Sequence, residues 1–330
     1  MVMENKFSFN GVGQGLFYSG SICNNAFNFV YDCGSMSSDK SVLKSAISAL
    51  HNELDFVVIS HLHDDHVNGL PEVFEKAHIK KIFLPYFNVK AYRDVFIASL
   101  ISGDILPNTP TFSILLRLYE VEIDINIYDE ALSETGLARI KDVEKVFCEE
   151  NRPFDHEKWQ FRFYNRKIDD RFYKKLNDKL QDILAGRTIE QYISEINGNF
   201  KELREAYNKI LNHTNMSSLL LMHWDPLNPI KKTLLTGDVK FDQDLEERLH
   251  RDISHSDEIV LQVPHHGATT EWQSVPQYID NRASDIILSF GLKNTYHHPS
   301  IKKLMSYYND SVLWKKIKFV FEGNSYPYYI

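Results

Sequence analysis

Four side chains that commonly ligate metals lie within six residues of one another in the first quarter of the sequence. They are His61, His63, Asp65 and His66, in the string HLHDDH that follows an apolar run starting at Phe56. Alternate residues of an extended segment point to one side, so the first two histidines can face one position and the other two ligands a neighbouring position. The chain has only 14 histidines in 330 residues, so three in six positions are unexpected by chance. We therefore interpret the cluster as a site for two metal ions and not as a solvated acidic turn.

Three more polar motifs follow apolar runs in the second half of the chain. Asp238 ends LLTGD, His265 and His266 lie in VPHHG, and His298 lies in NTYHHP. Loops at strand ends are where α/β folds gather functional groups. Each motif is weak alone, because Gly-Asp is usually a turn and His-Pro is usually a helix start. Their occurrence together with HLHDDH predicts one common site.

The strands and helices that must position these groups are predicted in two halves of the chain, each with an α/β pattern. Residues 1–85 and 213–330 contain short apolar strands, turns and amphipathic helices. Residues 86–212 contain apolar stripes at helical spacing and few turn signals. The pattern predicts a domain built from 1–85 and 213–330, with a mostly helical insertion over 86–212 that could cap a substrate.

The amino-acid composition limits the classes of protein to which the chain can belong. A chain with 43% hydrophobic and 25% charged residues is globular, and its net charge of −8 does not suit a general nucleic-acid binder. Cys23, Cys33 and Cys148 are few and widely spaced, so we expect neither a disulfide framework nor a thiolate zinc site. The N-terminus has no long apolar signal segment, and no apolar run reaches about 18 residues. We expect a cytoplasmic protein without a membrane span.

The motifs resemble those of the metallo-β-lactamase superfamily, and most of all the soluble metallo-hydrolase domain of competence-type DNA-uptake proteins. The resemblance covers residues 5–85 and 213–323 and leaves the insertion out. Its motifs are VGQG at 12–15, DCG at 32–34, HLHDDHVNGL at 61–70, NMSSLLL at 215–221, LLTGD at 234–238, VPHHG at 263–267 and NTYHHP at 294–299. It implies an αββα sandwich with two divalent metal ions at one edge, either zinc or manganese.

The resemblance also implies a division of ligands. One ion would bind His61 and His63, and the other would bind Asp65, His66 and His298, with Asp238 bridging the two. Imidazole and carboxylate ligands leave coordination positions for water and substrate. This division predicts a hydrolytic centre.

One superfamily ligand has no clear equivalent in this chain. Many members supply a third histidine to the first ion, whereas this chain has the Asn/Ser pattern of DNA-uptake-type members, with His213 just before it. We treat His213 as a weaker candidate ligand. The alternative is a first ion completed by water, which favours a substrate whose own oxygens complete the shell, such as a phosphate.

Acid–base groups are expected beside the metals. Relatives that cleave phosphodiesters use a histidine of the VPHHG motif to contact the phosphate or protonate the leaving group, which makes His265 and His266 the candidates. An unperturbed imidazole pKa near 6.5 suits that task, and one of the two histidines is expected to be structural. Asp65 completes the expected catalytic set.

A basic and aromatic stretch lies inside the predicted insertion. Residues 158–179 contain eight basic residues, six aromatic rings and three acidic residues, and Glu157 directly precedes them. Basic side chains with stacking rings suit a single-stranded nucleic acid or a nucleotide. The candidate substrate contacts are Arg162, Arg166, Arg171 and Lys175. The alternative is a solvated amphipathic helix whose rings face the core.

The leading prediction is a metal-dependent phosphodiesterase or nuclease, in which two ions about 3.5–4 Å apart share a hydroxide nucleophile. The substrate would be DNA, RNA or a small phosphodiester. A lactone or thioester hydrolase of the same fold is the first alternative, which the missing third histidine and the VPHHG motif disfavour. A non-catalytic partner module is the second alternative, which the full set of acidic and histidine ligands disfavours.

Overall fold

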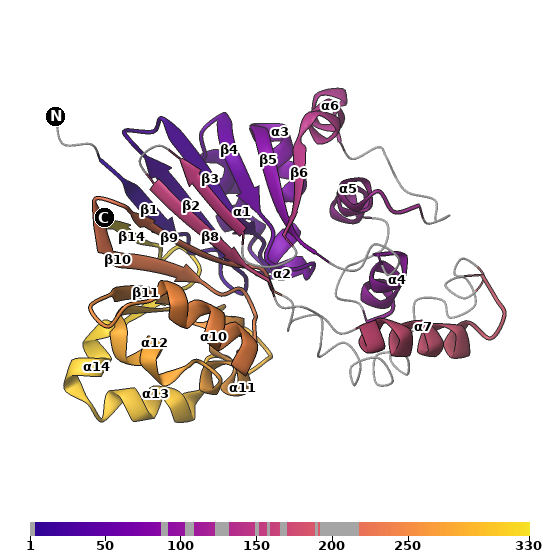
Figure 1. Ribbon diagram of the computed structural model, residues 1–330. Helices are drawn as coiled ribbons and strands as arrows, with labels where there is room; N and C mark the ends of the chain where they lie inside the picture. The colour runs from indigo at the N-terminus through magenta and orange to yellow at the C-terminus, as the bar shows by residue number, and fades with distance from the viewer. Residues whose placement is uncertain are drawn as a thin grey trace.

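The fold is a four-layer αββα sandwich built from two stacked seven-stranded sheets (Figure 1). The computed structural model describes residues 4–86, 92–102, 109–122, 132–148, 152–156, 159–165, 170–188, 191 and 218–330. Within these residues, no helix has the length and apolar character that a membrane crossing requires.

The first sheet has the strand order β14-β1-β2-β3-β4-β5-β6. In chain order its strands are β1 (Lys6–Phe9), β2 (Phe17–Ile22), β3 (Phe27–Cys33), β4 (Glu53–Val58), β5 (His78–Pro85), β6 (Glu144–Cys148) and β14 (Tyr326–Tyr329). The pairs from β3 to β6 are parallel, and the pairs from β14 to β3 are antiparallel. Parallel strands are covered on both faces, which agrees with β3 being buried along its whole length.

The second sheet repeats this plan with the order β13-β12-β11-β10-β9-β8-β7. Its strands are β7 (Arg152–His156), β8 (Trp159–Tyr164), β9 (Leu220–Asp225), β10 (Asn228–Leu235), β11 (Glu258–Gln262), β12 (Ala283–Ser289) and β13 (Ile317–Val320). The pairs from β10 to β13 are parallel, and the pairs from β7 to β10 are antiparallel. Each sheet therefore has a parallel half, and those halves supply the strand-end loops.

Helices cover the outer face of each sheet. Those before residue 190 are α1 (Lys40–Ser48), α2 (Asp64–Val67), α3 (Leu70–Lys76), α4 (Tyr92–Ser102), α5 (Pro110–Tyr119), α6 (Glu134–Asp142) and α7 (Asp170–Leu184). Those after residue 240 are α10 (Gln243–Asp252), the 3₁₀ turn η4 (Pro264–Gly267), α11 (Thr269–Gln273), α12 (Gln277–Arg282), α13 (Ile301–Tyr308) and α14 (Ser311–Lys316). Side chains that cap helix starts are Asp39, Thr109, Ser133, Asp242, Ser300 and Asp310. Such a cap stabilises a helix start by about 1 kcal/mol.

Three buried clusters hold the layers together. The middle cluster joins the inner faces of the two sheets and is rich in rings, such as Phe56, Trp159 and Phe161. The other two clusters lie between each sheet and its helices. Burying a large apolar side chain contributes about 1.5–3 kcal/mol, so these clusters supply the main stabilisation of the sandwich.

The predicted boundaries of the insertion are wrong in one respect. Residues 86–212 contain α4 to α7, as the helical stripes predicted, but they also contain β6, β7 and β8, which belong to the two sheets. The division between the halves therefore falls between β6 and β7. The reason is visible in β8, where Trp159, Phe161 and Phe163 alternate with more polar residues and point into the middle cluster. That period of two is a strand pattern, which the nearby helical stripes obscured.

Candidate metal centre

Loops at the ends of parallel strands from both sheets meet at one edge of the sandwich. The HLHDDH segment follows β4, Asp32 lies near the end of β3, Asp238 follows β10, and the VPHHG segment follows β11. Strand pairing sets these positions, because the carboxyl ends of parallel strands lie at the same edge of a sheet. Residues separated by about two hundred positions in the sequence are thereby brought together.

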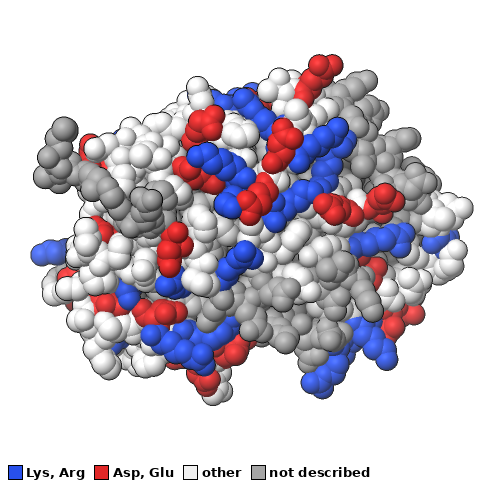
Figure 2. All heavy atoms as spheres, turned by 45° about the horizontal axis from the view of Figure 1, so that its top comes forward, with Lys and Arg blue, Asp and Glu red and all other residues white. Residues whose placement is uncertain are grey.

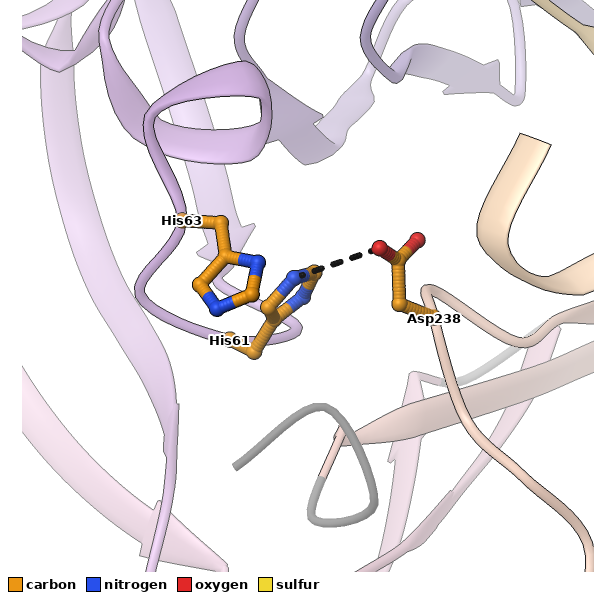
Figure 3. A group of neighbouring side chains, drawn as sticks. All are labelled: His61, His63 and Asp238. Carbon is orange, nitrogen blue, oxygen red and sulfur yellow. Dashed lines mark ion pairs between the residues drawn. The ribbon is translucent and has the colours of Figure 1, made fainter. Parts of the chain in front are cut away.

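The first group of potential ligands comprises His61, His63 and Asp238. One ligand atom from each lies within 4.8 Å of the others. Figure 3 shows the two imidazoles on the loop after β4, and the carboxylate facing them from the loop after β10. His61 Nε2 lies 3.6 Å from Asp238 Oδ2, and both side chains are buried.

The second group comprises Asp65, His66 and His266. His266 Nε2 lies 3.1 Å from Asp65 Oδ2, and His66 Nε2 lies 3.9 Å from Asp65 Oδ1. Asp238 connects the two groups, because its Oδ1 lies 3.1 Å from His66 Nε2 while its Oδ2 faces His61. Asp238 thus lies between the two groups, and its role as a bridge between two metal ions stays a prediction.

Asp32 fixes the orientation of a histidine in each group. Its Oδ2 accepts hydrogen bonds from His66 Nδ1 at 2.7 Å and from the Ser60 hydroxyl at 2.6 Å. Because that hydroxyl donates to Asp32, it accepts from His61 Nδ1, which lies 2.9 Å away. Both imidazoles therefore carry their proton on Nδ1 and present the lone pair of Nε2 to the site. The DCG motif pointed to this region, but no role was predicted for Asp32 from the sequence.

His266 is held in the same tautomer by a backbone carbonyl. Its Nδ1 lies 2.9 Å from the carbonyl oxygen of Ser289, which can only accept, so Nδ1 donates and Nε2 has the lone pair. His265 and His266 both have positive φ, at 50° and 52°. A non-glycine residue in this conformation costs of order 1–3 kcal/mol, and such strain concentrates at functional sites.

The donors fit two divalent cations. When His66 and His266 are neutral with the proton on Nδ1, as metal binding requires, each Nε2 lone pair lies 3.1 Å from a carboxylate oxygen, which is also an acceptor. His61 Nε2, His66 Nε2 and Asp238 Oδ1 are buried without a hydrogen bond. A cation between such atoms removes the repulsion, and two ligands of one tetrahedral zinc lie about 3.3 Å apart, given bonds of about 2.0–2.1 Å. The spacing of 3.1–3.6 Å agrees with this value.

The titration of these groups reflects how closely charges are packed. Burial lowers the pKa of His61 well below its usual value, and the neighbouring His66 and His63 lower it further. Burial opposes the charged form of His66 as well, but Asp238, Asp65 and Asp32 raise its pKa well above the usual value. Burial would also raise the pKa of Asp238, but His265, His66 and His61 lower it well below the usual value. Carboxylates that stay ionised in a buried site are suited to a cation.

His265 lies beside both groups but in neither. Its Nε2 is 3.6 Å from Asp238 Oδ2, and its Nδ1 is 3.5 Å from Glu271 Oε2 on α11. Burial would lower the pKa of His265, but Asp238 and Glu271 raise it to about 9. His298, predicted from the sequence as a ligand, is also outside the two groups, with its ring 5.3 Å from that of His265. His266 lies where the prediction placed His298.

The glycine of the DCG motif permits the close contact between β3 and the metal-binding segment. A Cβ on Gly34 would lie 2.3 Å from the carbonyl carbon of Asp65 and the amide nitrogen of His66, so only glycine fits. The VGQG segment supports the same backbone, since Leu16 N donates to the carbonyl of Asp65 at 3.1 Å. The two glycine motifs therefore serve to pack loops and not to bind a phosphate.

Gln262 joins the loops after β10 and β11, and no sequence motif pointed to it. Its side-chain oxygen accepts from the amides of Thr236 and Gly237, at 2.7 and 2.9 Å, and from the Thr236 hydroxyl. Its amide nitrogen donates to the carbonyls of Gly237 and Val263, at 3.2 and 2.7 Å. The side chain is 2% exposed. It thereby fixes the loop of Asp238 relative to that of His265 and His266.

Of the other predicted site residues, those that the structure describes belong to neither group of donors. His213 and Arg166 lie outside the described residues. Arg162 forms an ion pair of 2.7 Å with Asp155 and lies over the ring of Trp224, while Arg171 and Lys175 are exposed on α7. The rings of Trp159, Phe161 and Phe163 are core residues, so the prediction that they stack on a ligand is wrong. Their alternation along β8 turns them inward.

The αββα fold and the paired donor groups define the class of protein as a metallo-β-lactamase-type fold with a candidate dinuclear centre. The family model of the metallo-β-lactamase superfamily matches residues 18–83, from β2 to β5, which include the HLHDDH motif. This match and the fold support that superfamily. The narrower resemblance to DNA-uptake proteins stays a prediction, and a comparison with curated proteins finds no match.

Solved structures of similar architecture are distant in sequence. The metallo-β-lactamase fold protein YhfI from Bacillus subtilis is 8% identical with a TM-score of 0.48, over 99% of this chain and 100% of that chain. An isothiocyanate hydrolase from Delia radicum gut bacteria is 9% identical with a TM-score of 0.49, over 98% and 100% of the two chains. The short form of human tRNase Z is 12% identical with a TM-score of 0.41, over 87% and 93%. Sequence identities and TM-scores as low as these say nothing about the activity of this chain.

Proposed function

We propose that this protein is a metal-dependent hydrolase that cleaves phosphodiesters with two divalent ions. The observation that supports the proposal best is the position of Asp238, whose two oxygens lie 3.6 Å from His61 Nε2 and 3.1 Å from His66 Nε2. One carboxylate that reaches both groups suits a pair of ions side by side. When bound, such ions activate water at neutral pH and draw charge off the oxygens of a phosphoryl group.

The proposed ligands differ from those expected from the sequence at one position. His61 and His63 would hold one ion, and Asp65, His66 and His266 the other, with Asp238 shared. Zinc accepts such imidazole and carboxylate donors, and manganese accepts them as well. His298 would then line the rim of the site.

The small number of protein donors supports a phosphodiester over an ester with a single carbonyl. The ion held by His61, His63 and Asp238 would have three protein donors, which leaves a position for an oxygen of the substrate, and a phosphodiester has two non-bridging oxygens to offer. A lactone or thioester offers one carbonyl oxygen.

The protein's own acid would be His265. Asp238 and Glu271 flank its two ring nitrogens, at 3.6 and 3.5 Å, so the ring is held with an edge toward the shared carboxylate. His265 would hold a proton at Nε2 and deliver it to the oxygen that leaves phosphorus. Glu271 touches no metal group and would orient the ring through Nδ1.

The test is a substrate panel with protein loaded with Zn²⁺ or Mn²⁺. We expect hydrolysis of bis-p-nitrophenyl phosphate above that of a thioester and a lactone. Asp238→Asn should lower that activity at least about 100-fold, beyond the 10–100-fold typical of groups that only support ligands. Asp225→Asn, an equally conservative change at the end of β9, should keep the activity. Turnover of the thioester or the lactone without turnover of any phosphodiester would make the proposed function wrong.

A further inference from the structure

The loop 291–299 and the start of α13 adjoin the candidate metal centre, and α14 packs against α13. Ser300 N donates to the carbonyl of Gly267 at 2.8 Å, which ties the start of α13 to the end of the VPHHG turn. The ring of His298 lies 5.3 Å from that of His265, and the ring of Tyr296 is stacked on His298 at 6.2 Å. This part of the surface therefore begins at the rim of the site and extends along α13 and α14.

The same region concentrates positive charge in an acidic chain. Residues 291–318 contain six lysines and a single acidic residue, Asp310, whose carboxylate caps α14, while the whole chain has a net charge of −8. Lys303 and Lys318 are paired with aspartates of α12 and β12. The remaining lysines, which pair with no acidic group among the described residues, are Lys293, Lys302, Lys315 and Lys316. By contrast, positive and negative side chains are interspersed on the face in Figure 2.

Exposed rings and apolar side chains accompany these lysines. Tyr296 is 59% exposed and Tyr308 is 60% exposed. Ile301 and Met305, at 75% and 49%, lie four residues apart on α13 and continue toward Tyr308 three residues later. These positions form one exposed stripe of α13, which is about 12 Å long.

We propose that this lysine-rich surface, formed by the loop 291–299, α13 and α14, binds a single-stranded nucleic acid and directs it to the metal centre. The inference rests on the proposed function, since a nucleic acid is the polymeric phosphodiester. Unpaired cations that follow a track, with exposed rings beside them, match the way proteins hold single strands. An anionic membrane would also attract the lysines, but it would not use a track that ends at a hydrolytic site.

The surface differs from the basic stretch that the sequence pointed to. In that stretch, Arg162 is neutralised by Asp155 and the rings of β8 are buried. Along α13 and α14, Lys302, Lys315 and Lys316 pair with no acidic group among the described residues, and Tyr308 is exposed, although Lys303 is paired with Asp280. A segment can bind a nucleic acid when its lysines are unpaired and its rings are exposed, and not simply because the sequence contains many of them.

The experiment measures binding of a fluorescein-labelled, 20-nucleotide phosphorothioate oligothymidylate, which resists hydrolysis, to the metal-loaded protein between 50 and 300 mM NaCl by anisotropy. The test variant is Lys293→Gln/Lys302→Gln/Lys315→Gln. We expect its Kd at 50 mM NaCl to rise at least about tenfold, and the slope of log K against log salt to fall by about 2, since each phosphate contact contributes about 0.7.

Two sets of control variants test whether the effect on binding is specific to this surface. Lys6→Gln/Lys44→Gln/Lys141→Gln removes three other exposed lysines and should bind like wild type. Tyr296→Ala should weaken binding about fivefold or more, whereas Tyr296→Phe keeps the ring and should not. Melting curves and metal content establish that each variant is folded.

Several outcomes overturn the proposal. They are a wild-type protein that does not bind the oligonucleotide at 50 mM NaCl, equal Kd and slope for the two triple variants, and preference for phosphatidylserine vesicles over the oligonucleotide. The two proposals fail separately. Lysine-dependent binding without hydrolysis of any phosphodiester rejects the proposed function and keeps the surface, whereas hydrolysis of bis-p-nitrophenyl phosphate with lysine-independent binding rejects the surface alone.

Discussion

Asp32 is the residue whose replacement tests the candidate centre most directly. Its carboxylate accepts from the Ser60 amide, the Ser60 hydroxyl and His66 Nδ1, at 2.7, 2.6 and 2.7 Å. Asp32→Asn replaces the shared Oδ2 with an amide group, which donates. Asparagine tolerates the positive φ of 53° at this position, so the change adds no backbone strain.

The expected effect follows from the tautomers. An amide donor facing His66 favours the proton on Nε2, where it blocks the lone pair that would bind a metal. Loss of a partner that orients a metal-binding histidine typically lowers metal affinity 10–100-fold, which is about 1.4–2.7 kcal/mol. Because Ser60 holds His61 through the same carboxylate oxygen, we expect losses toward 100-fold and at both ions.

The assay is competition for Zn²⁺ with a chromophoric chelator, which reads affinity without any need for activity. Asp39→Asn is the matched control, because Asp39 is an exposed cap of α1 whose carboxylate contacts Ser41, so the change removes the same charge without altering the hydrogen bonds of Asp32. Metal mass spectrometry gives the number of ions bound. If Asp32→Asn binds two ions with the affinity of wild type, the tautomer argument is refuted.

The remaining predictions concern the ligands, the loop support and a buried ion pair. His266→Ala should lower the number of bound ions from two to one, whereas His265→Ala should keep both and lower turnover about 10²–10⁴-fold; loss of metal from His265→Ala would contradict its assigned role. Gln262→Met should destabilise the protein by about 3 kcal/mol or more in urea unfolding, because four buried backbone groups each lose a hydrogen bond, of which only the Gly237 carbonyl keeps another among the described residues, from His265 N. Gln277→Met on the surface should stay within about 0.5 kcal/mol. Asp257→Asn should cost about 3 kcal/mol at pH 7 by leaving the buried Lys232 unpaired. Burial would raise the pKa of Asp257, but Lys232 and Ser254 lower it. The stabilisation that the Asp257 carboxylate provides is therefore present above the pKa of the unfolded chain and is lost as the pH falls through the pKa of the folded protein. A destabilisation by Asp257→Asn that does not shrink near pH 3 would contradict this pH dependence.

The pairing of distant loops explains which parts of the site sequence reasoning could reach. The motif HLHDDH is local, and its spacing alone indicated two positions for metal ions. The strand-end position of Asp238 was also readable, because a buried apolar run ends directly before it. The presence of His266, and not His298, in the second candidate group was not readable, because it depends on the Ser289 carbonyl that fixes the ring and on the positive φ of both VPHHG histidines.

The residues that hold the site in position were harder to predict, because no motif in the sequence around them indicates their role. Gln262 looks like an ordinary polar residue at the end of a strand, and its role follows only from the backbone atoms of 236, 237 and 263 around it. Glu271 lies on a five-residue helix and gains its role from the imidazole of His265, 3.5 Å away. Arg162 of β8 was predicted to contact substrate because its partner, Asp155, comes from the adjacent strand and is not evident from the pattern of the sequence.

The sequence by itself determined the type of chain and the chemistry of its ligands. The spacing of apolar residues indicates two α/β halves, and the donor types of HLHDDH, Asp238 and VPHHG indicate a candidate metal centre. Each of these patterns is made by residues that are close together in the chain. Tertiary structure decided which imidazoles share a carboxylate, which ring nitrogen keeps its lone pair, and which lysines remain unpaired. These depend on strand order and on loops about two hundred residues apart, so the physical information lies in contacts that only the folded chain makes.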